Sequence, residues 1–135
     1  MDKMTVRMPV AIKAKVTETL KTKIIGDLQK RIQQISLELE QFEFTAKRAI
    51  VEQENQDESL VEALQQQIEV ERSKRIAAKQ ETEAKLKRAE KLEYGAEIGH
   101  GQLERTVDLE IGTDLDKIMG AEIVTEDGKI VAFRA

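Results

Sequence analysis

Apolar residues recur at alternating spacings of three and four between residues 25 and 49, and this repeat constrains the fold more than any other feature. Its positions are Ile25, Leu28, Ile32, Ile35, Leu39 and Phe42, followed by Ala46 and Ala49. Such spacing places the residues on one face of an α-helix, and about three heptads of it are typical of a coiled-coil seam. We therefore predict a long helix that begins after Thr17, a good N-cap, and packs its seam against a second helix.

The repeat loses its phase in a polar stretch at residues 53–59. Ser59 followed by Glu62 fits a capping box, and Asp57 is an alternative cap for a new helix. A turn near residues 54–59 would make residues 17–94 an antiparallel helical hairpin with arms of nearly equal length. One continuous rod is the alternative, because no glycine or proline enforces the turn.

The second arm is patterned less regularly than the first. Its apolar positions are Val61, Leu64, Ile68, Ile76, Ala77, Ala78, Ala84, Leu86, Ala89 and Leu92. These residues are the predicted partners of the first seam.

Short alternating segments flank the helical region. Residues 4–16 alternate apolar and polar side chains, which predicts a strand, and Pro9 places that strand locally at a sheet edge or bulge. Residues 96–98 and 107–111 predict two more strands, with the glycines around His100 forming a loop between them. Either Thr113 or Asp114 caps a short helical turn that Gly120 stops. Asp127-Gly128 predicts a two-residue type I′ turn in a terminal β-hairpin.

The segment 95–135 is too short to build a core alone, and the strand at 4–16 would complete it. The predicted fold class is therefore α+β: a long antiparallel coiled-coil hairpin inserted between an N-terminal strand and a small C-terminal β-domain. That β-domain would be an open sheet or a small barrel.

Composition limits the functional classes. The chain is 36% charged and 3% aromatic, has no cysteine and carries a net charge of −4. Disulfides and thiolate metal sites are thereby excluded, and no apolar run is long enough for a membrane span. We expect a cytoplasmic protein with no cofactor, no bound metal and no membrane contact. Nucleotide-binding and hydrolase motifs are absent, and the lone His100 lacks partner ligands, so we expect no catalytic residues and no enzyme activity.

A second apolar stripe lies on the first helix, on the face opposite the seam. Leu37, Phe44 and Val51 recur every seven residues. In an isolated two-helix hairpin they would face water, so either they are scattered surface residues or they form a contact patch. We predict the contact patch, which would make the protein a homo-oligomer, either a dimer or a tetramer.

Charge is distributed in blocks. Residues 32–71 hold ten acidic and two basic groups, whereas residues 72–91 hold eight basic and three acidic groups. The basic block is Arg72, Lys74, Arg75, Lys79, Lys85, Lys87, Arg88 and Lys91. Such blocks are often only solvated surface, but this one is also a candidate phosphate-binding patch. Because it lacks aromatic residues for base stacking, RNA binding is the alternative rather than the first hypothesis.

The C-terminal third resembles a known family. The residues concerned are Gly95-Ala96-Glu97-Ile98, the strand at 107–111 that leads into Gly112-Thr113-Asp114-Leu115-Asp116, and residues 122–131. This arrangement is similar to the YlqD-like bacterial proteins. The resemblance implies a bacterial origin and carries over no activity and no catalytic residue.

These observations favour a non-enzymatic interaction or assembly module that self-associates through its helical hairpin and contacts a further protein partner. The alternative is an RNA- or ribosome-associated factor that uses the basic block.

Overall fold

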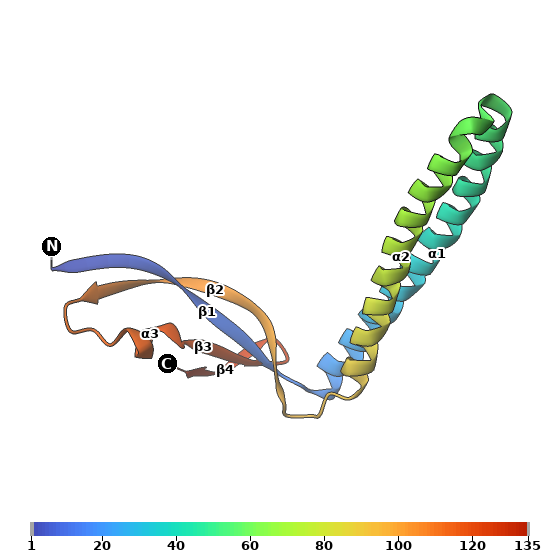
Figure 1. Cartoon of the computed structure of the whole chain (residues 1–135). Coiled ribbons are helices and arrows are strands. Elements are labelled where there is room, and N and C mark those ends of the chain that lie inside the picture. Colours follow the sequence, from blue (N-terminus) through green and yellow to red (C-terminus); the bar gives the residue numbers. More distant parts are fainter. Residues whose placement is uncertain (1, 135) are drawn as a thin grey trace. The chain divides into compact units, whose positions relative to one another are not determined.

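The structure is a computed structural model that describes residues 2–134. It divides into two units: a helical unit of residues 23–91, and a β-unit made of residues 1–22 together with residues 92–135. Figure 1 shows the elements of both units along the chain. The predicted α+β fold class is confirmed, and the β-unit contains an open four-stranded sheet rather than a closed barrel.

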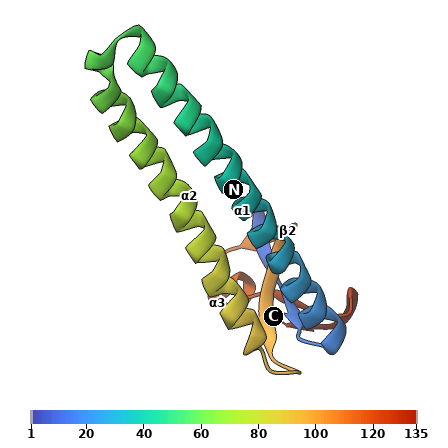
Figure 2. The same ribbon diagram turned by 90° about the vertical axis from the view of Figure 1, so that its right-hand side faces the viewer.

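Two long helices form the hairpin. Helix α1 spans Glu18–Gln56, a short 3₁₀ turn η1 spans Glu58–Leu60, and helix α2 spans Val61–Glu90. The two helices run side by side in opposite directions (Figure 2), so the alternative of one continuous rod is wrong. No helix among residues 2–134 is long and apolar enough to cross a membrane.

Side-chain caps mark the start of α1 and of the 3₁₀ turn η1. Thr17 Oγ1 accepts a hydrogen bond from the Leu20 amide at 3.1 Å, which caps α1 as predicted. At the turn the cap is Asp57, whose carboxylate accepts from the Ser59 amide at 3.1 Å. Asp57 thus caps the 3₁₀ turn η1. Helix α2 follows directly from η1, and its own N-cap residue, Leu60, makes no side-chain cap bond, so neither Ser59 nor Asp57 caps α2 as predicted.

The predicted seam of α1 is buried or half-buried along its length, with Ile35 and Ala46 buried most deeply. The seam predicted for the middle of α2 is wrong. There Ile76, Ala77, Ala78 and Ala84 are exposed. Four half-buried residues there, Arg72, Arg75, Lys79 and Thr82, instead continue the three–four spacing from Ile68, and Glu71 beside them is also half-buried. Long basic side chains can occupy such positions because their aliphatic stems cover apolar surface.

The sheet has the strand order β2-β1-β3-β4. Its strands are β1 (Lys3–Lys15), β2 (Glu97–Glu110), β3 (Glu122–Glu126) and β4 (Lys129–Arg134). Strand β1 pairs with β2 in antiparallel fashion along its length and with β3 in parallel fashion over Ala11–Ala14. Pro9 thus lies where β1 has only one partner strand, in agreement with its predicted edge character.

Strand β2 corrects one prediction. The two short strands and the glycine loop are a single strand, and the pairing jumps from Ile12–Gly101 to Lys13–Gly99. His100 is the extra residue of this β-bulge, and Gly101 has φ +127°. A bulge accommodates one unpaired residue and a glycine backbone without ending the strand.

The terminal hairpin and the short helix agree with the sequence. Asp127 and Gly128 have φ angles of 49° and 83°, the positive values of a type I′ turn. Helix α3 spans Leu115–Met119, and Asp114 caps it by accepting from the Lys117 amide at 3.4 Å.

The β-unit has a small core. Val16 and Val124 are almost fully buried, and Val10, Ala14 and Ala121 are also buried. Backbone hydrogen bonds from Val16 N to Ala96 O (2.7 Å) and from Gly95 N to Val16 O (2.8 Å) fasten the end of β1 to the segment that returns from the hairpin. The first strand and the C-terminal segment therefore form one folded unit.

Candidate interaction surfaces

The second stripe on α1 is accessible to a partner. The exposed fractions of Leu37, Phe44 and Val51 are 56%, 65% and 55%. Lys47, Arg48 and Glu52 flank Phe44 and Val51 and form a shallow groove with them. The Arg48 guanidinium lies 6.0 Å from the centroid of the Phe44 ring. A large aromatic side chain in such a position is a typical anchor of a protein–protein contact.

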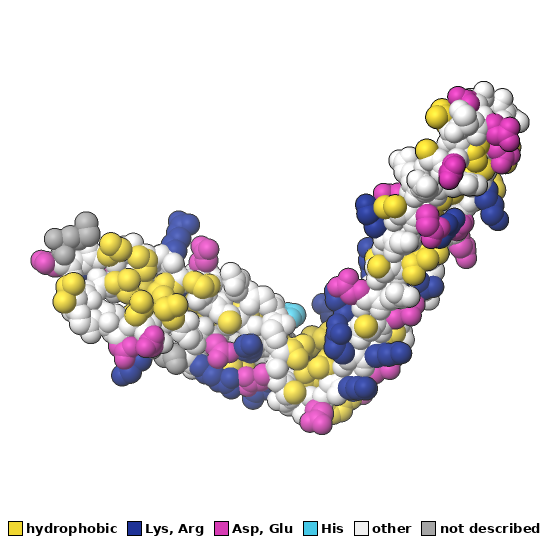
Figure 3. All heavy atoms as spheres, in the orientation of Figure 1, with side chains coloured by type: hydrophobic (Ala, Val, Ile, Leu, Met, Phe, Trp, Pro, Cys, Tyr) yellow, Lys and Arg dark blue, Asp and Glu magenta, His cyan; other side chains and the backbone are white. Residues whose placement is uncertain are grey.

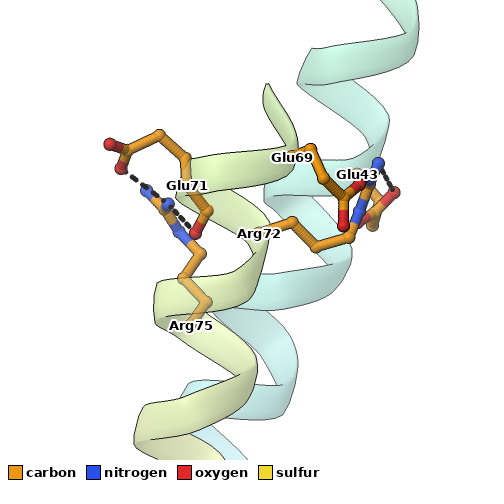
Figure 4. Close-up of polar contacts among 5 residues, drawn as sticks. All are labelled: Glu43, Glu69, Glu71, Arg72 and Arg75. Atoms are coloured by element: carbon orange, nitrogen blue, oxygen red, sulfur yellow. Dashed lines mark hydrogen bonds and ion pairs between the residues drawn. The ribbon is translucent and has the colours of Figure 1, made fainter. Parts of the chain in front are cut away.

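Two arginines of the basic block are engaged inside the helical unit. Arg72 extends from α2 to α1, where its Nε and Nη2 donate to the Glu43 carboxylate at 2.5 and 3.0 Å, and it also pairs with Glu69 (Figure 4). Arg75 donates to Glu71 at 3.2 Å and holds its guanidinium 4.2 Å from the centroid of the Phe42 ring. These two arginines therefore join the two helices and are only partly available to a ligand.

The remaining basic side chains differ in accessibility. Lys74 pairs with Glu71 at 3.4 Å and Lys85 pairs with Glu81 at 3.7 Å. Lys79 is half-buried. Lys87, Arg88 and Lys91 at the end of α2 are exposed and make none of the ion pairs found among residues 2–134. Five of the eight basic side chains are thus exposed, whereas Arg72, Arg75 and Lys79 are half-buried.

The ion pairs shift the pKa values of the groups that form them. Hydrogen bonds from Arg72 hold the pKa of Glu43 below its usual value, and Glu43 in turn raises the pKa of Arg72. Hydrogen bonding by Arg75, with Lys74 nearby, lowers the pKa of Glu71. Both carboxyls therefore favour the charged form in the folded protein.

The helical unit should consequently lose stability in acid. A carboxyl whose pKa is lowered on folding stabilises the protein fully above its unfolded pKa, near 4.5, and loses that contribution as the pH falls through the lower folded value. We expect Glu43→Gln to reduce the difference between the urea midpoints measured at pH 7 and pH 3. Glu54→Gln is the control, because Glu54 on α1 makes no ion pair with another described residue. An equal change in both variants would contradict this assignment.

The β-unit carries a surface that the sequence did not reveal. Strand pairing places Val10, Leu103, Ile123 and Phe133 on one face of the sheet, where they line a groove together with Arg105. Phe133 is 76% exposed. Figure 3 shows further hydrophobic side chains gathered over the part of the β-unit that β1 and β2 occupy in Figure 1. The alternation of apolar and polar residues in each strand indicates which residues share a face of that strand. Which residues of different strands lie on the same face of the sheet can be predicted only when the strand order is known.

His100 is exposed at the β-bulge, and no group of three or more His, Cys, Asp or Glu side chains that could hold a metal occurs within residues 2–134.

Comparison with known proteins identifies the family and the fold. None of the curated proteins matches the sequence significantly. A crystal structure of a protein of unknown function from Synechococcus sp. WH 8102 is similar over 100% of both chains, with 24% sequence identity and a TM-score of 0.91. At this identity the likeness concerns the fold alone. The YlqD protein family matches residues 4–134, so the chain belongs to this family.

Proposed function

We propose that the protein is a non-enzymatic interaction or assembly module that self-associates through α1. The observation that carries the proposal is the exposure of three large apolar residues, Leu37, Phe44 and Val51, at heptad spacing on one helix face. A single hairpin leaves this stripe in water, and a partner helix would remove it from water.

Incomplete burial of the seam supports the same proposal. Among the residues of α1 and α2, only Ile35, Ala46, Ile68 and Ala89 are buried. Two helices alone therefore shield little apolar surface, and association with further helices would add to their stability.

Phe44→Ser should lower the oligomeric state. The substitution removes the central and most exposed anchor of the stripe, so we expect the wild type to be a dimer or tetramer and the variant to be largely monomeric. Light scattering after size-exclusion chromatography, at concentrations around the dissociation midpoint of the wild type, measures the difference. Val70→Ser is the matched control, because Val70 is a similarly exposed apolar residue on α2. A monomeric wild type, or an unchanged Phe44→Ser protein, would contradict self-association through this stripe.

RNA binding is the second candidate function, and the exposed Lys87, Arg88 and Lys91 favour it. Contacts of these side chains with phosphates would make the affinity depend on salt concentration. A gel shift at low salt that is lost in the variant with Lys87→Glu and Arg88→Glu would support this function. The absence of a gel shift at low salt would contradict RNA binding.

A further inference from the structure

We propose that two copies of this chain pair in antiparallel orientation along α1, with a two-fold axis at Phe44. The proposal rests on self-association through the stripe and adds the partner and its orientation. Leu37 and Val51 each lie seven residues from Phe44. An antiparallel alignment centred on Phe44 therefore places Leu37 opposite Val51 of the second copy, and Phe44 opposite its own counterpart.

The charges beside the stripe agree with this alignment. On an α-helix, residues three positions after each stripe residue lie on one flank, and those four positions after lie on the other. Glu40 and Lys47 occupy the first flank, and Gln41 and Arg48 occupy the second. Antiparallel pairing brings each flank against the same flank of the second copy. Glu40 then faces Lys47 of the other chain, twice by symmetry, and Gln41 faces Arg48.

A parallel pair would have the opposite electrostatics. Each flank would meet the other flank at the same height, so Lys47 would face Arg48 of the second copy twice. Like charges in direct opposition disfavour that arrangement. The charges therefore select one of the two orientations.

The groups required for this pairing are available. Glu40, Lys47 and Arg48 are exposed, and none of the ion pairs among residues 2–134 uses them.

Charge reversal tests the orientation. Lys47→Glu places a second carboxylate opposite Glu40 in the antiparallel pair, so we expect the dissociation constant of the full-length protein to rise about three- to tenfold. In a parallel pair the new carboxylate would face Arg48, and association would strengthen. Adding Glu40→Lys to Lys47→Glu restores the complementary pair and should return the dissociation constant toward the wild-type value. Analytical ultracentrifugation measures the constant, and circular dichroism checks that the helices persist.

Cross-linking gives an independent readout, because the chain has no cysteine of its own. In the antiparallel pair the two copies of residue 37 lie about 21 Å apart along the helices, given 1.5 Å of rise per residue. With a short bismaleimide, a mixture of Leu37→Cys and Val51→Cys proteins should give cross-linked heterodimers, identified by intact mass. Neither variant alone should cross-link.

The outcomes separate the two proposals. Efficient cross-linking of Leu37→Cys alone, or tighter association of Lys47→Glu, would overturn the antiparallel geometry while leaving self-association through the stripe intact. A monomeric wild type would overturn both proposals.

Discussion

Replacing Val124 by aspartate is expected to unfold the β-unit. Val124 on β3 is 0% exposed and is one of the few buried residues of the β-unit. An unpaired charge at such a position costs on the order of 3–5 kcal/mol. Domains of this size have only about 5–15 kcal/mol of total stability, and the β-unit, with few buried residues, should lie at the low end of that range. Loss of the sheet signal in circular dichroism and faster proteolysis of the flanking segments would report the unfolding.

A milder variant and a matched control distinguish the stability lost from core burial from the stability lost through lower strand propensity. Val124→Ala should cost about 2–3 kcal/mol, because it leaves a cavity in a packed core. Val131→Ala makes the same chemical change on the neighbouring strand β4, where the side chain is about half exposed. Its cost should stay below about 1 kcal/mol, the span of strand propensities. Equal effects of the two alanine variants would show that the β-unit does not depend on this core.

Local signals in the sequence predicted much of the fold. The Asp127-Gly128 turn was predictable because its two positive φ angles are a property of two adjacent residues. The seam of α1 was predictable because its apolar spacing is continuous over several heptads. In both cases, residues close together in the sequence are sufficient to predict the local structure.

The parts that were mispredicted depend on residues far away in the chain. Whether the glycines around His100 end a strand is decided by β1, which continues past them and converts the break into a bulge. Likewise, Arg75 lies in the seam of α2, where its guanidinium makes a cation–π contact with the Phe42 ring on α1. Apolarity alone therefore favoured Ile76, one position away.

The candidate surfaces also differ in whether they can be predicted from local sequence or depend on residues far away in the chain. The stripe of Leu37, Phe44 and Val51 was identified from spacing alone, and the structure places all three side chains in exposed positions. The pairing of Arg72, a member of the basic block, with Glu43 could not be predicted, because it depends on how the two helices pack. A face formed by four strands, such as the one that contains Phe133, depends on a strand order that sequence patterns do not specify.

Replacing Ile68 by aspartate should melt the helical hairpin. Ile68 on α2 is 8% exposed, while Val70, two positions along the same helix, is 55% exposed. Ile68→Asp loses the burial of a large aliphatic side chain and introduces a charge into the seam, which together should cost at least about 3 kcal/mol. Val70→Asp makes a comparable change on the outer face and should shift the stability by no more than about 0.5 kcal/mol. Thermal unfolding followed by circular dichroism at the helix band compares the two variants. If they melted together, the hairpin seam would not be what holds α1 against α2.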